Sequence, residues 1–181
     1  YKPAPPRIPP EVVDAAMVQN TRDFAAAQVP VAVAHAEAWR GPVTENPNFK
    51  AWFGDSKATD ADGAPLVVYH GTTADVGEFR AGMFTSNPAL ADNYAMGGGG
   101  NVIPAYLSIK NPMPWEDAFG KTPDEVKAAG FDGVIQRDDA GRILRAVVTD
   151  PAQVKSAIGN SGRFDPNSAS LTDPVPRAAA T

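Results

Sequence analysis

The sequence predicts an α+β fold, and three observations support this. Short apolar, partly β-branched runs recur along the chain between turn residues, and only a few short segments carry helix signals. Strands and helices do not alternate, which argues against repeated β-α-β units. Residues 11–28 and 31–40 have helical patterns and precede the first strand. We therefore expect one α+β domain with an N-terminal helical arm.

Proline and glycine mark the expected boundaries. Residues 1–10 contain five prolines and predict an extended linker. A helical arm is expected over 11–43 and the main domain over 44–166. The polar, proline-broken end predicts a disordered tail over 167–181. Because the chain begins at Tyr1 without a methionine, we expect a segment of a longer chain.

The expected elements of the main domain follow in order. A short helical turn is expected over 49–53, and an extended piece begins at Val154. Strands are expected over 66–70, 82–86, 102–109, 131–136 and 143–149. Asn87 and Pro88 predict a helix over 88–95, since Asn caps helix N-termini and Pro suits the first helical position. A further helix is expected over 123–129, where acidic residues in the first turn complement the helix dipole.

Composition excludes several kinds of chemistry. The chain has no cysteine, which excludes disulfides, thiolate zinc sites and a cysteine nucleophile. Its only two histidines, His35 and His70, exclude a multi-histidine metal site within one chain. A net charge of −5 argues against a broad phosphate-binding surface. No apolar run is long enough to span a bilayer. We expect no metal, no membrane partner, and protein in preference to nucleic acid.

Few residues are candidates for chemistry. His70 ends an apolar strand before Gly71, where a side chain and backbone can face a ligand, although a local hydrogen bond would also explain it. Phe84 and Tyr94 flank a strand–helix turn and could sandwich a flat heterocycle or simply pack in the core. The tetraglycine 97–100 lacks the Lys-Ser/Thr of a phosphate-binding loop, so we expect a mobile rim. Acidic pairs at 116–117 and 138–139 are expected to be solvated turns.

Taken together, these segments resemble a family. Residues 69–72 (YHGT), followed by 82–87 (GMFTSN) and Asn93-Tyr94, resemble the NAD-binding core of ADP-ribosyltransferases of the diphtheria-toxin and poly(ADP-ribose) polymerase branch. Residues 49–72 and 150–166 are similar to the ADP-ribosyltransferase domains of phage and mobile-element polyvalent proteins. The resemblance covers about residues 44–166. It implies a split pair of small antiparallel sheets with NAD bound in the cleft between them.

The resemblance also implies residue roles. His70 would bond the ribose on the nicotinamide side, and the Gly71 backbone would hold the carboxamide. Tyr94 would stack on the nicotinamide, with Phe84 as the second ring. The remaining NAD-contacting positions implied are Tyr69, Thr72, Thr85 and Ser86.

The activity implied is that of an NAD-dependent mono-ADP-ribosyltransferase. NAD would be the co-substrate, and ADP-ribose would pass to a macromolecular acceptor with release of nicotinamide. The protein would serve as a toxin, an effector or a phage-associated modifier, delivered into a target cell or carried by a phage.

Two positions depart from the family pattern. Ala91 stands where relatives often have a small hydroxyl residue. Arg145 stands where relatives have the catalytic Glu that bonds the ribose 2′-hydroxyl, and Arg has five donors and no acceptor. The loss of this Glu argues against polymer formation.

Three interpretations of Arg145 stay open. Asp138 or Asp139 could supply the carboxylate, or the acceptor's own carboxylate could do so. Otherwise the domain is a catalytically inactive binding module in which Arg145 grips a phosphate or a partner. A more distant interpretation is a structural spacer in a longer polypeptide.

Overall fold

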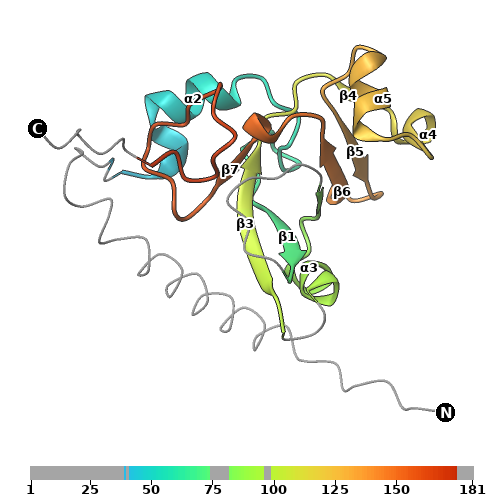
Figure 1. Ribbon diagram of the computed structural model, residues 1–181, viewed down its shortest axis with the longest axis horizontal. Coiled ribbons are helices and arrows are strands. Elements are labelled where there is room, and N and C mark those ends of the chain that lie inside the picture. Colours follow the sequence, from blue (N-terminus) through green and yellow to red (C-terminus); the bar gives the residue numbers. More distant parts are fainter. Residues whose placement is uncertain (1–38, 40, 74–81, 96–98, 175–181) are drawn as a thin grey trace, which may run out of the picture.

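A computed structural model describes residues 39, 41–73, 82–95 and 99–174 (Figure 1). The expected linker over 1–10 and nearly all of the expected helical arm lie outside the described residues. No helix in the described part of the chain is long and apolar enough to cross a membrane.

Two small sheets make up the domain (Figure 1). The first has the order β1-β3-β7 and is antiparallel throughout. Its strands are β1 (Val68–Thr72), β3 (Asn101–Leu107) and β7 (Val154–Ser156). The second has the order β2-β6-β5-β4. Its strands are β2 (Met83–Phe84), β6 (Ile143–Val148), β5 (Gly133–Arg137) and β4 (Pro112–Met113). The α+β expectation is confirmed, except that β4 runs parallel to β5.

Short helices and 3₁₀ turns connect the strands. They are η1 (Val43–Glu45), α2 (Pro47–Phe53), α3 (Pro88–Tyr94), α4 (Trp115–Ala118), α5 (Pro123–Ala128) and η2 (Pro151–Gln153). The helix start predicted at Asn87 is confirmed, because its side chain accepts hydrogen bonds from the Ala89 and Leu90 amides. At α5, Thr122 and Glu125 form a reciprocal capping box. Local capping chemistry therefore defines where these two helices begin.

β4 and α4 were not predicted. β4 has two residues and α4 has four, so neither is long enough to show a hydrophobic period. Both exist because Met113 and Ala118 bury their side chains with Val126 and Val134. Tertiary packing, rather than local sequence, forms these elements.

The main core fills the space shared by the two sheets. Val68 and Leu107 of the first sheet pack with Phe84, Ala146 and Val148 of the second, and all five side chains are buried. Burying each large apolar side chain contributes roughly 1.5–3 kcal/mol. This shared core holds the start of β1 against β2.

An aromatic cluster covers the other side of the first sheet. Its buried rings are those of Phe49, Trp52, Phe53, Tyr106 and Phe164. The Phe49 ring contacts the Tyr106 ring edge-on, with centroids 4.9 Å apart. The residues expected to form a helical turn at 49–53 are thus the anchor of α2.

The expected disordered tail is wrong over its first part. Lys155 on β7 is completely buried, and its ammonium donates to the carbonyls of Ser168 (2.9 Å) and Ser170 (3.1 Å). It also pairs with the buried Asp173 carboxylate at 2.8 Å. Because a buried ammonium needs partners, it holds residues 167–174 on the domain. Residues 175–181 lie outside the described part of the chain.

We predict that Lys155→Met destabilises the domain by about 3–5 kcal/mol, since it leaves the buried Asp173 carboxylate without its cation. Lys127→Met is the matched control. Its ammonium lies 3.6 Å from Asp150 and its side chain is 60% exposed, so we expect a change below about 1 kcal/mol. Urea unfolding measures both, and equal losses would contradict the prediction.

Candidate active site

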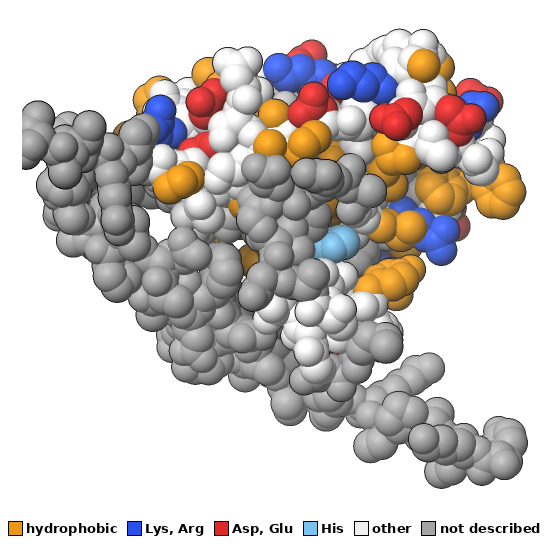
Figure 2. All heavy atoms as spheres, viewed as in Figure 1, with side chains coloured by type: hydrophobic (Ala, Val, Ile, Leu, Met, Phe, Trp, Pro, Cys, Tyr) orange, Lys and Arg blue, Asp and Glu red, His pale blue; other side chains and the backbone are white. Residues whose placement is uncertain are grey.

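The two sheets meet where β1 passes β2. Tyr69 donates its amide hydrogen to the Thr85 carbonyl at 2.8 Å and accepts from the Thr85 amide at 3.0 Å. This bridge is isolated, with no further β1–β2 pairing among the described strands. Immediately after it, the Nδ1 of His70 lies 2.9 Å from the Met83 carbonyl oxygen. His70 thus occupies the seam between the sheets. On the face drawn in Figure 2, hydrophobic side chains reach the surface among charged ones.

The contact with Met83 determines the tautomer of His70. A carbonyl can only accept, so Nδ1 carries the hydrogen and the acceptor lone pair lies on Nε2 in the neutral ring. Burial lowers the pKa of His70 below its ordinary value of 6.5, and the Met83 hydrogen bond opposes this effect. At neutral pH the ring is therefore neutral, and Nε2 can accept a hydrogen bond from a hydroxyl group.

Gly71 lies directly beneath helix α3. A Cβ at this position would overlap the Ala91 carbonyl oxygen and would lie 2.9 Å from the Ala95 nitrogen. Only glycine allows the helix to approach the strand this closely. Backbone groups alternate in direction along a strand, so the Gly71 N–H and C=O point to the same side as those of Tyr69, away from β3. They can therefore serve a ligand that lies at the seam.

The two aromatic candidates differ in exposure. Phe84 is completely buried in the main core, with its ring 5.3 Å from the His70 ring. Tyr94, the last residue of α3, is 51% exposed. The structure therefore places Phe84 beside His70 but gives it no exposed face for a ligand, whereas Tyr94 presents its ring to solvent.

The remaining candidates on β1 and after β2 are near the same seam. Tyr69 and Thr72 are half-buried on β1. The hydroxyl of the buried Thr85 accepts from the Asn87 amide, and the Ser86 hydroxyl donates to the Ile143 carbonyl at 2.8 Å. These two hydroxyls hold the turn into α3. Contact of any of these residues with NAD stays a prediction.

Arg145 is not brought together with His70. Its guanidinium lies over the Trp115 ring, 5.5 Å from the ring centroid. Val147, two residues further along β6, packs against the cluster that contains Met113. Ala146, between them, faces the main core with Phe84. Side chains alternate across a strand, so Arg145 lies on the face of β6 opposite Phe84.

Asp138 is engaged in its own hairpin turn, and a role of Asp139 at the seam stays a prediction. Asp138 accepts from the Ala140 and Arg142 amides and pairs with the Arg142 guanidinium at 2.7 Å. The Arg142 amide is the main cause that lowers the pKa of Asp138. Its oxygens are thus used in the hairpin turn, as expected for a turn residue. Among the described residues, no group of three His, Asp or Glu could hold a metal ion.

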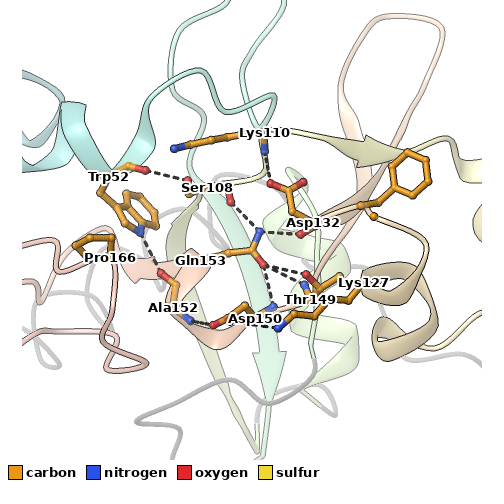
Figure 3. Close-up of a pocket in the computed structure, with 12 residues that line it drawn as sticks. Trp52, Ser108, Lys110, Lys127, Asp132, Thr149, Asp150, Ala152, Gln153 and Pro166 are labelled. Carbon is orange, nitrogen blue, oxygen red and sulfur yellow. Dashed lines mark hydrogen bonds and ion pairs between the residues drawn. The ribbon is translucent and has the colours of Figure 1, made fainter.

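A pocket of about 520 Å³ lies elsewhere, between α2, η2 and the start of β5 (Figure 3). Gln153 crosses it and donates to the Ser108 and Asp132 carbonyls, while its amide oxygen accepts from the Asp150 amide. The indole of Trp52 donates to the Ala152 carbonyl. None of the candidate NAD residues lines this pocket. Sequence reasoning did not single out Gln153, although the Asp150-Pro151 step before it signals a capped turn.

Part of the chain is similar to a known protein family. The family model described as ADP-ribosyltransferase in polyvalent proteins matches residues 60–122. This confirms the resemblance seen in the sequence and supports ADP-ribosyltransferase activity in general terms. The match contains the seam residues of β1, β2 and α3, but not Arg145. No curated protein and no solved structure matches the chain.

We predict that His70 titrates below pH 6.5, because burial disfavours the imidazolium. The unfolded chain then binds more protons than the folded one as pH falls below 6.5. The free energy of unfolding is therefore unaffected by this group above that pH and decreases below it. NMR of the ring protons measures the midpoint, and His35→Gln assigns the two signals. A midpoint above 6.5 would contradict the prediction.

Proposed function

We propose that this domain is an NAD-dependent mono-ADP-ribosyltransferase that transfers ADP-ribose to a macromolecular acceptor, protein in preference to nucleic acid. One observation carries the proposal. In β1, His70 is followed by Gly71, which packs against α3, and the last residue of α3, Tyr94, has an exposed ring. These residues lie within the segment that matches ADP-ribosyltransferases of polyvalent proteins.

The residues at the seam fit the functional groups of NAD. The neutral His70 ring offers Nε2 as an acceptor for a ribose hydroxyl. The Gly71 N–H and C=O complement a carboxamide, which has both donors and an acceptor. The exposed Tyr94 ring offers a face for the flat, cationic nicotinamide ring. Each residue type thus matches the group that we assign to it.

NAD supplies a ribose carbon whose bond to the nicotinamide nitrogen breaks as an acceptor nucleophile bonds to that carbon. The chain's part is to hold this geometry. Tyr94 and Gly71 fix the leaving ring, and His70 fixes the sugar, so that the bond to be broken is held in one orientation. The acceptor's proton is lost to water.

We further propose that the domain serves as a toxin, an effector or a phage-associated modifier. The family description, which refers to polyvalent proteins, supports this context. The net charge of −5 favours a protein acceptor over nucleic acid, because phosphate binding requires a cationic surface.

Incubation of the domain with labelled NAD and a cell lysate tests the proposal. We expect transfer of label to macromolecules and release of nicotinamide. Tyr94→Ala should lower the NAD affinity by tenfold or more, or about 1.4 kcal/mol, because it removes the exposed ring. Phe119→Ala is the matched control, since Phe119 is 83% exposed and lies outside α3. Folded protein that neither binds nor cleaves NAD would overturn the proposal.

A specific observation favours a second candidate, an inactive ADP-ribosyltransferase-fold module that binds nucleotide or protein. The β6 side chains in the main core with Phe84 are Ile143, Ala146 and Val148. All three are apolar, so this face of β6 offers no carboxylate to stabilise positive charge on the ribose carbon. This candidate predicts NAD binding without turnover.

Arg145→Glu distinguishes the two candidates further. Since Arg145 lies over Trp115 on the opposite face of β6, we expect this change to alter NAD affinity and turnover by less than about twofold. Calorimetry with NAD and the label-transfer assay measure these quantities. If the variant gains transfer that the parent lacks, the inactive module is the better description, and Arg145 reaches the NAD site.

A further inference from the structure

The last turn of helix α3 packs against two glycines of the first sheet. Gly71 on β1 contacts Ala91 and Ala95. Gly100, the residue before β3, also contacts Ala95. A Cβ at Gly100 would lie 2.5 Å from the Thr72 carbonyl oxygen and 2.7 Å from the Ala95 carbonyl oxygen. Cβ atoms in proteins essentially never approach backbone atoms within 3.0 Å, so both positions exclude a side chain.

The register of the first sheet explains why both glycines reach the same helix end. Thr72 pairs with Asn101, so Gly100, one residue before Asn101, lies just beyond this end of the β1–β3 ladder. Ala91 and Ala95 have no exposed surface, which agrees with close packing of this turn on the sheet. Tyr94, between them in sequence, is half exposed. The buried alanines therefore hold the turn, and the turn carries the exposed ring.

We infer that Gly100 is a positioning residue for the candidate active site, an inference that rests on the proposed function. It fixes the end of α3 against β1, and so it fixes the Tyr94 ring relative to His70. Gly100 and Gly71 both contact the backbone of Ala95. Ala95 directly follows Tyr94 in the chain, and Gly71 directly follows His70. The interpretation of the tetraglycine as only a mobile rim is therefore incomplete, because its last residue is tightly packed.

The chain offers a matched control beside the tested residue. A Cβ at Gly99 would meet no atom of the described residues within 4 Å, so Gly99→Ala adds a methyl group that overlaps none of them. Gly100→Ala adds the same methyl group one residue later, where it must push the Thr72 and Ala95 backbones apart. A displacement of about 1 Å in a reacting geometry can cost roughly a hundredfold in rate.

We therefore expect Gly100→Ala to raise the dissociation constant of NAD by tenfold or more and to lower kcat/KM at least as much. Gly99→Ala should leave both within twofold of the parent. Leu171→Ala serves as a stability control, because Leu171 is buried in the main core but belongs to none of β1, β2 and α3. If Leu171→Ala weakens NAD binding as much as Gly100→Ala at equal loss of thermal stability, the positioning role is overturned.

Failure of this inference can be told apart from failure of the proposed function. If the parent binds NAD and Gly100→Ala binds it equally well, the positioning role fails and the proposed function stands. If the parent does not bind NAD, the proposed function fails. NMR of the free protein still decides the positioning role: the resonances of Gly71 and Tyr94 should shift in Gly100→Ala and not in Gly99→Ala.

A second variant covers the case in which Gly100→Ala does not fold. Ala95→Gly loosens the same contact from the helix side without adding an atom, since the Ala95 methyl lies 3.0 Å from the Cβ position at Gly100. We expect its NAD dissociation constant to rise several-fold above that of Leu171→Ala. Equal constants in these two variants would overturn the positioning role.

Discussion

The pairing of Tyr69 with Thr85 is the contact on which the candidate site depends. It is the isolated bridge between the two sheets among the described residues, which pair no further beyond it. His70 is the next residue, so its ring lies beside this junction and donates to the Met83 carbonyl. The main core beneath this point, around Phe84, resists displacement of one sheet against the other because interiors are closely packed. The position of His70 is therefore a consequence of how the sheets are joined.

Much of the fold could be predicted because its signals are local. A β-branched run predicts a strand, and Asn87 before Pro88 predicts a helix start, whatever the rest of the chain does. The C-terminal segment could not be predicted in this way. A lysine in a short strand is normally expected to be exposed, and only the three-dimensional structure places Lys155 in the interior, where Asp173 neutralises it. The segment 167–174 is ordered by this long-range contact, to which its polar composition gives no guide.

The sequence selected residues that lie together at the seam, but it could not predict which of their side chains are exposed. The resemblance selected His70, Phe84 and Tyr94, and all three lie in or beside the strands at the seam. Sequence could not tell which aromatic ring would be exposed, because burial depends on what packs over each one. Phe84 is enclosed by both sheets, while Tyr94 ends a helix whose buried side is supplied by alanines. Gly71 and Gly100 mark where the backbones of β1 and α3 touch, which their burial alone does not show.

One extra residue in β6 changes the face of the strand on which the Arg145 side chain lies. The pairing of β5 with β6 shifts register, from Gln136 opposite Arg145 to Arg137 opposite Ile143, so Leu144 is a bulged residue. Ile143 faces the main core, yet Arg145, two residues on, lies over Trp115 on the other face. In a regular strand these two side chains would share a face.

The positive charge of Arg145 therefore lies on the far side of β6 from His70. In the proposed reaction it would oppose positive charge at the ribose carbon less than its position in the sequence suggests. Coulomb energy falls with distance, and solvent screens an exposed group. Whether the domain can catalyse transfer thus depends on which group reaches the His70 side of the seam.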